Sequence, residues 1–234
     1  MKIHSRKFIP FIFILLLCVA GCHRWDRPEC SKKGSCFPAF TGDQPCQAPC
    51  WQRITPGLTT IDETLAILDS LEFVNDPSMT GEIHVFDEQI AFSAVDGAWV
   101  ANISFIEGKV AYIIFWGELS TSFGEAEELF ASPQKVLYYR HSTADIVLDI
   151  FNLDEGIAYG TSSAYMNRSE HENLLSPKSK VNILRFWDAQ YWDLFVEEKV
   201  FHWGTFKDGD MYSNLQDWKG YGKTEDLYIL KELE

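Results

Sequence analysis

Cysteine is the residue type whose number and spacing in this chain most clearly indicate chemistry. A thiol can accept a lipid, form a disulfide or bind a metal ion, depending on its compartment and spacing. Four of the six cysteines lie in one short stretch, at Cys30, Cys36, Cys46 and Cys50. Outside the cytoplasm this even number predicts two disulfides, with three possible connectivities. The alternative is a four-thiolate zinc site, although its usual CxxC pairs are replaced here by C-x5-C and C-x3-C.

The N-terminus predicts export. Residues 1–7 carry three positive charges and no acid, and residues 8–20 are almost entirely apolar. A basic segment before a short apolar one is typical of a signal peptide, since a membrane-spanning helix needs about 20 apolar residues. Val19-Ala20-Gly21-Cys22 resembles a bacterial lipobox, which implies cleavage after residue 21 and lipid on Cys22. An ordinary signal peptide and an uncleaved anchor are the alternatives.

The negative charge of the chain after residue 21 favours membrane anchoring by lipid rather than by basic residues. The chain has a formal charge of −14, and removing residues 1–21 removes three positive charges and leaves −17. Such a body is repelled by anionic lipid head groups and by nucleic-acid phosphates. We therefore expect membrane attachment through the N-terminal lipid, with the body on the extracytoplasmic face of a cell membrane. We expect no nucleic-acid partner and no cofactor.

No set of residues predicts a catalytic or metal site. The chain has no Gly-x-Ser-x-Gly elbow and no P-loop. His171-Glu172 begins an HExxH zinc motif, but Leu175 stands where the second histidine is needed. Residues 208–214 place oxygen donors as a calcium loop does, but they lack its central glycine and the closing glutamate is missing. Among the many acidic residues, no pair stands out as an acid–base couple.

Aromatic residues crowd the C-terminal region. Aromatic side chains dominate protein cores, so we expect most of them to cap a sheet. Those that are exposed would form a patch suited to a sugar polymer or a protein partner. The candidates for this surface are Trp192, Trp203, Trp218 and Tyr221.

The sequence pattern of residues 51–234 predicts an α+β fold of two tandem units, each a short helical segment packed on an antiparallel meander sheet. In the first unit, Thr60 and Glu63 form a capping box before a helix over 61–71. In the second, Ser122 and Glu125 repeat the box before a helix that Ser132-Pro133 ends. The expected division is a signal peptide over 1–21, a Cys-rich tether over 22–50, a first unit over 51–117, and a second unit with an aromatic extension over 118–234.

Alternating runs bounded by turn residues predict the strands of both meanders. Asp96-Gly97 and Glu107-Gly108 are tight-turn dipeptides in the first unit, and 170–180 is loop-like in the second. The expected strands are 83–86, 90–95, 98–106 and 110–116, then 136–140, 145–151, 156–162 and 181–187.

Several short motifs carry a resemblance. Cys50-Trp51 with Ile54, Pro56-Gly57 and Thr60 resembles the Cys-Trp-x-x-Ile-x-Pro-Gly-x-Thr opening of a group of uncharacterised bacterial lipoproteins. Phe123-Gly124-Glu125, Ser132-Pro133 and Trp218-Lys219-Gly220-Tyr221-Gly222 are also similar to that group. More distantly, the opening is similar to small lipoproteins of outer-membrane assembly and to β-lactamase-inhibitor-like domains, which pack a helical pair on an antiparallel sheet. The resemblance implies architecture and location, and it transfers no activity.

These features together predict a membrane-anchored extracytoplasmic lipoprotein that binds or scaffolds a protein and is not an enzyme. One alternative is an inhibitor-like module against a secreted enzyme. The other is a cell-wall-associated hydrolase whose active site is not recognisable in the sequence. A flat exposed patch would favour binding, whereas an open cleft lined by two or more buried carboxylates would favour the hydrolase.

Overall fold

The computed structural model describes residues 46–77, 80–95, 97–117, 119, 121–130, 132–141, 146–162, 174–192 and 211–233. The predicted signal peptide, the lipid-acceptor position Cys22 and most of the tether lie outside these residues. Within the described part of the chain, no helix is both long and apolar enough to cross a membrane.

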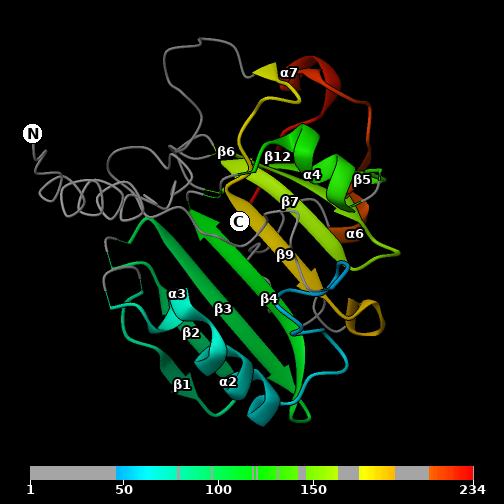
Figure 1. Cartoon of the computed structure of the whole chain (residues 1–234). Helices are drawn as coiled ribbons and strands as arrows, with labels where there is room; N and C mark the ends of the chain where they lie inside the picture. The colour runs from blue at the N-terminus through cyan, green and yellow to red at the C-terminus, as the bar shows by residue number, and fades with distance from the viewer. Residues whose placement is uncertain are drawn as a thin grey trace, which may run out of the picture.

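One large, mostly antiparallel sheet runs through the described chain (Figure 1). Its strands follow the order β1-β2-β3-β4-β9-β7-β6-β5-β10, and β12 also pairs with β5. The strands of this sheet are β1 (His84–Phe86), β2 (Gln89–Ser93), β3 (Trp99–Ile106), β4 (Lys109–Gly117), β5 (Lys135–Arg140), β6 (Ile146–Asn152), β7 (Ile157–Ser162), β9 (Ile183–Trp187), β10 (Gln216–Asp217) and β12 (Lys231–Glu232). A second, two-stranded sheet pairs β8 (Leu174–Leu175) with β11 (Gly222–Lys223).

The helical segments are short. They are α2 (Ile61–Ser70), α3 (Glu72–Asn75), α4 (Phe123–Phe130), η2 (Ala189–Tyr191), α6 (Met211–Asn214) and α7 (Thr224–Leu227). The predicted α+β class, with two helix-plus-meander units in tandem, is confirmed. The domain boundaries remain a prediction.

Both predicted capping boxes are present and start the two principal helices. At α2 the amide of Thr60 donates to Glu63 over 2.9 Å, and the Glu63 amide donates back to the Thr60 hydroxyl over 3.4 Å. At α4 the same exchange joins Ser122 and Glu125, with distances of 2.7 and 3.4 Å. Each box pairs two amide groups that lack a partner within the helix, so the local sequence fixes where the helix begins.

The meander of the first unit buries the face that its alternation predicts. Trp99, Ala101, Ile103 and Phe105 of β3 are all buried, whereas Val100 between them is exposed. The helices α2 and α3 lie across this face (Figure 1), and Leu68 of α2 is part of the same core. The period of two in the strand and the apolar stripe of the helix therefore meet in one core.

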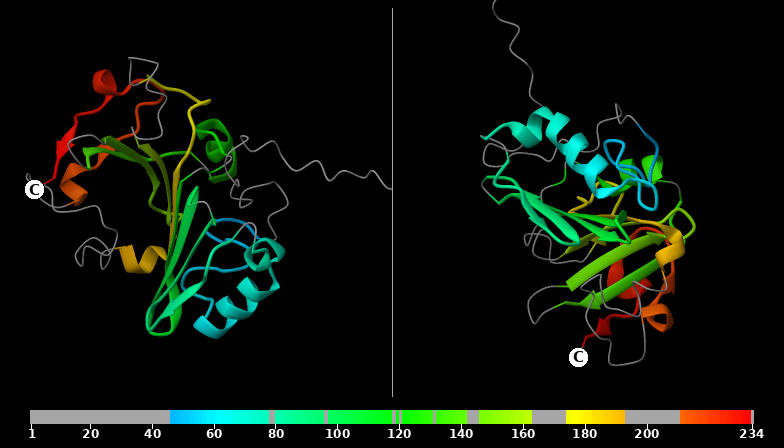
Figure 2. Two further views of the ribbon diagram at one scale, coloured as in Figure 1. Left: turned by 90° about the vertical axis from the view of Figure 1, so that its left-hand side faces the viewer. Right: turned by 90° about the horizontal axis from the view of Figure 1, so that it is seen from below.

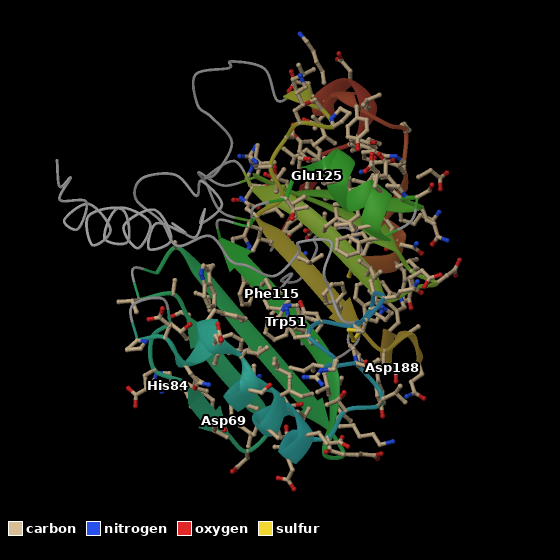
Figure 3. The ribbon with its side chains drawn as sticks, viewed as in Figure 1. Trp51, Asp69, His84, Phe115, Glu125 and Asp188 are labelled. Carbon is tan, nitrogen blue, oxygen red and sulfur yellow. A yellow bond between two sulfur atoms is a disulfide. The ribbon has the colours of Figure 1, made fainter. Side chains whose placement is uncertain are left out.

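The end of the tether is built into this core. Cys46 and Cys50 form a disulfide, and the next residue, Trp51, is fully buried. The Trp51 ring lies 5.0 Å from the ring of Phe115 on β4, and the two side chains are adjacent in Figure 3. Backbone hydrogen bonds between Trp51 and Ile54, of 2.9 and 2.7 Å, close a tight loop. The Cys-Trp-x-x-Ile motif therefore fastens the tether to the first unit.

The two meanders are joined edge to edge through β4 and β9. β4 pairs antiparallel with β9, and β9 pairs antiparallel with β7, so one sheet serves both units. Read from the outside inward, the first unit runs β1-β2-β3-β4 and the second runs β5-β6-β7-β9. Apart from β10 and β12, the strand order is thus the same in both halves, and the two halves meet at the antiparallel β4–β9 pair.

The sheet has a core on each face. The helices α2 and α4 pack on the same face, where Phe123 and Phe130 of α4 contact the ring of Tyr159 on β7. The opposite face carries a second cluster that includes Trp187, Trp192 and Met211. Figure 2 shows η2 and α6 on the other side of the sheet from α2, whereas Tyr228, which follows α7, belongs to the same core as α2 and α4.

Candidate functional site

The residues predicted for the anchor and the disulfides fall partly outside the described chain. Cys22, Cys30 and Cys36 lie there. The sulfur atoms of Cys46 and Cys50 are bonded to each other, with the Cα atoms 5.8 Å apart. The prediction of disulfides is confirmed for this pair, and the second predicted disulfide, for which Cys30 and Cys36 are left, remains a prediction.

The predicted aromatic surface is largely packed in the structure. Trp192 is only 8% exposed, and its ring lies 5.1 Å from that of Trp187. Trp218 and Tyr221 are half-buried, and the Trp218 ring stacks on Tyr228 at 5.9 Å. Trp203 lies outside the described residues. The binding role of these aromatic residues remains a prediction, and the packing of Trp192 and Trp218 is what a core role requires.

A buried ion pair is the most strongly charged feature of the interior. Nη1 of Arg185 on β9 donates to Oδ1 of Asp149 on β6 over 2.6 Å, and the two side chains are 3% and 0% exposed. On the intervening strand β7, Asp149 lies opposite Gly160 and Arg185 opposite Ala158. A Cβ atom at Gly160 would collide with the Asp149 carboxylate and lie 2.5 Å from the Leu148 carbonyl oxygen, so glycine at this position makes room for the carboxylate.

The surroundings of the pair keep the Arg185 guanidinium charged and the hydroxyls of Tyr112 and Tyr139 protonated. Burial alone would lower the pKa of Arg185, but the Asp149 carboxylate outweighs it and the pKa is raised, so the guanidinium stays charged. Burial raises the pKa of Tyr112 and, together with Asp149, that of Tyr139. The Tyr139 hydroxyl donates to Oδ2 of Asp149 over 3.4 Å. This arrangement holds four side chains in place, and burial keeps them from reacting with a solute.

Metal and hydrolytic chemistry gain no support from the described side chains. Within the described ranges, no three His, Cys, Asp or Glu residues are grouped so as to hold a metal ion. His171 and Glu172 lie outside these ranges, and the segment 208–214 is described only from Met211. Asp149 is the single buried carboxylate of the described chain, whereas the hydrolase alternative needs a pair in a cleft.

The outer edge of β1 is the site most clearly open to a partner. All three β1 residues are exposed, with Val85 at 56% and Phe86 at 60%. In the described chain β1 pairs with β2 alone, so no described strand covers its other side. Figure 3 shows His84 at this outer margin of the sheet. Sequence reasoning predicted a strand at 83–86 but did not identify it as an edge, because its alternation is short and its position depends on pairing far along the chain.

The register decides which groups of β1 face outward. His84, Val85 and Phe86 pair with Ala91, Ile90 and Gln89, in that order. The amide of Phe105 on β3 donates to the carbonyl oxygen of Glu88 over 2.9 Å, which places the backbone groups of Ile90 on the β3 side. Hydrogen-bonded and non-hydrogen-bonded pairs alternate in an antiparallel ladder. The N–H and C=O of Val85 therefore point away from β2, toward the open edge.

A shallow depression lies elsewhere, beside the start of α2. Its volume is about 480 Å³. It is lined by Arg53, Thr55, Leu58, Thr59, Glu63, Ala66 and Ile67. The hydrogen bond from the Thr60 amide lowers the pKa of Glu63, so this carboxylate is engaged in the capping box. The Glu63 carboxylate therefore serves the start of α2 rather than a ligand in the depression.

Comparison with protein-family models, with curated proteins and with solved structures finds no match to this chain.

Proposed function

We propose that this protein is a lipid-anchored lipoprotein on the extracytoplasmic face of a bacterial cell membrane, and that it binds another protein through the outer edge of β1. The observation that carries the binding function is the exposure of Val85 and Phe86 on a strand that has a pairing partner on one side only among the residues the structure describes. Edge strands are templates for pairing with another chain, and folded proteins usually blunt or cover them. An edge strand that exposes apolar side chains can serve as a binding surface, and the three-residue length of β1 and the acidic residues around it restrict which chains can pair with it.

Three features support the anchor and its compartment. The basic and apolar N-terminus ends in Val19-Ala20-Gly21-Cys22, the lipobox-like segment. The Cys46–Cys50 disulfide fits an oxidising compartment. The resemblance of the Cys-Trp opening to uncharacterised bacterial lipoproteins fits the same location. Two or more acyl chains would hold the protein firmly, because each buried methylene contributes about 0.8 kcal/mol.

The anchor is tested by the intact mass of the protein extracted from membranes, compared with a Cys22→Ser variant. We expect the wild type to lack residues 1–21 and to carry the mass of two or three acyl chains, and the variant to lose both features. An unmodified Cys22 in the mature wild type would refute the lipoprotein assignment.

Binding is tested by chemical cross-linking in intact cells, followed by purification of the tagged protein. A second lipoprotein with the same tag is the control. We expect at least one envelope protein to be enriched with the wild type over the control. The absence of any such enrichment would contradict the binding function, whatever the state of Cys22.

A further inference from the structure

The two outer strands of the sheet hold equivalent positions in the two units. Each of β1 and β5 is the first main-sheet strand after its unit's helices, and each is the outermost strand of its unit's four-stranded meander; only β10 and β12 lie beyond β5. What the fold does at one outer edge therefore indicates what the other edge can accept.

The chain covers the outer edge of β5 with its own C-terminal extension. β10 pairs antiparallel with the start of β5, and β12 pairs parallel with its end. The basic residues at the ends of β5 meet acidic residues of these added strands. Lys135 pairs with Asp217 at 2.6 Å, and Arg140 pairs with Glu232 at 3.1 Å. Strand addition with complementary charges at both ends is thus already present in this fold.

The β1 edge has the opposite charges at the same spacing. Glu82 and Asp87 flank β1 five positions apart, as Lys135 and Arg140 are in β5, and Glu88 adds a third exposed carboxylate. Residues 51–117 contain ten acidic and two basic residues, a formal charge of −8. Because the basic ends of β5 pair with acidic residues of the added strands, a strand added to the acidic β1 edge should carry basic residues at its ends.

We propose that β1 accepts an extended segment of a partner protein, with apolar residues between two basic residues about five positions apart. This proposal rests on the proposed binding function and names its mode, β-strand addition. The outward N–H and C=O of Val85 supply the main-chain hydrogen bonds. The side chains of His84 and Phe86 lie on one face of the sheet and that of Val85 on the other, so the added segment contacts them alternately.

A second copy of this chain is a poor occupant of the edge. Two β1 strands paired antiparallel about Val85 would place Glu82 of each chain opposite Glu88 of the other. Like charges directly opposite one another destabilise a pair of strands. The net charge of the whole chain, −14, adds repulsion between copies.

The test uses the mature lipidated protein, residues 22–234, in detergent and two fluorescent hexapeptides with blocked ends. The probe is Lys-Val-Thr-Val-Thr-Arg, and its acidic counterpart is Glu-Val-Thr-Val-Thr-Glu. Val85→Pro removes the outward N–H without touching the bonds to β2, and Val85→Thr is the matched control that keeps it. Circular dichroism checks that both variants fold.

Fluorescence anisotropy should show binding of the basic peptide and about tenfold weaker binding of the acidic one, with the difference reduced by salt. Val85→Pro should weaken binding roughly fivefold or more, since a main-chain hydrogen bond is lost, and Val85→Thr should stay within about twofold. As a second route, replacing Glu82 and Glu88 by Gln and Asp87 by Asn should abolish the preference for the basic peptide.

Three results would overturn strand addition at β1: no binding of the basic peptide, equal binding of both peptides, or equal binding by the Pro and Thr variants. None of these results would remove the binding function if cross-linking in cells still enriches a partner. Conversely, peptide binding with the expected pattern but no partner in cells would leave the edge chemistry intact and refute the proposed function.

Discussion

Replacing Arg185 by Met isolates the energetic effect of burying an ion pair, because the chain contains a second pair of the same length at its surface. Arg185–Asp149 and Lys135–Asp217 both have N–O distances of 2.6 Å. The first pair is 3% and 0% exposed, whereas the side chains of the second are 40% and 80% exposed. Lys135→Met is therefore the matched control for Arg185→Met.

The magnitudes follow from the two environments. Removing one partner of a buried pair leaves an uncompensated charge and costs about 3–5 kcal/mol. Removing one partner of an exposed pair costs about 0–1 kcal/mol, because solvent screens the charge that remains. In a protein of this size about 1 kcal/mol lowers the Tm by roughly 2–4 °C. We therefore expect Arg185→Met to lower the Tm by roughly 6–20 °C and Lys135→Met by less than about 4 °C.

The assay is thermal unfolding of the purified protein, followed by far-ultraviolet circular dichroism. The double variant Asp149→Leu, Arg185→Met should regain much of the lost stability, because replacing both partners leaves no unpaired charge. Equal Tm changes for Arg185→Met and Lys135→Met would refute the reasoning. So would a double variant that is as unstable as the sum of its two single variants.

The packing of Gly160, the capping box at Ser122 and the cysteines give three further predictions. Gly160→Ala should lower the free energy of unfolding by about 1–3 kcal/mol in a chemical denaturation experiment, because the added Cβ would lie 2.5 Å from the Leu148 carbonyl oxygen. Gly81→Ala is the control and should change the free energy of unfolding little, since the nearest atoms to its Cβ lie at 3.5 Å. The hydrogen bond from the Ser122 amide lowers the pKa of Glu125 below its ordinary value of 4.5. The ionised Glu125 carboxylate therefore contributes its full stability above pH 4.5, and this contribution is lost as the pH falls through the lowered pKa. Glu125→Gln should therefore be less stable than the wild type at pH 6 and equal to it in strong acid, and a constant gap across this range in a pH series of melting curves would contradict the assignment. Peptide mapping without reduction should find Cys30–Cys36 as the second disulfide, and either residue linked to the Cys46–Cys50 pair would contradict this connectivity.

Local signals predicted the parts of the fold that local interactions determine. The capping boxes at Thr60 and Ser122 mark helix starts because the bonds join residues three positions apart. The turn at Glu107-Gly108 separates β3 from β4 as predicted, since both residues adopt the positive φ angles that such a turn requires. These elements could be read from the sequence without knowledge of the rest of the chain.

Long-range pairing could not be read in the same way. β9 lies between β4 and β7 and so joins segments that are tens of residues apart in the sequence. The sequence of β9 does not indicate which strands pair with it. The strands β10 and β12 have two residues each, which is too short for a period to show.

The candidate site was missed for the same physical reason. An edge strand such as β1 differs from an inner strand only by what pairs with it. Asp149 and Arg185 did carry a signal, because each is a single charge inside an otherwise apolar run of strand residues. Opposite charges in two buried strands indicate a buried pair, and this signal could have placed β6 near β9.

Site-specific photo-cross-linking in living cells tests whether the β1 edge of this protein binds a partner. A benzophenone amino acid would replace Phe86 on β1 in one variant and Leu129 on α4 in the other, both exposed positions. We predict a discrete cross-linked species from position 86 that is lost when Val85→Pro is added, and none from position 129. Equal yields at the two positions, or a yield at position 86 that the proline leaves unchanged, would contradict binding through the β1 edge.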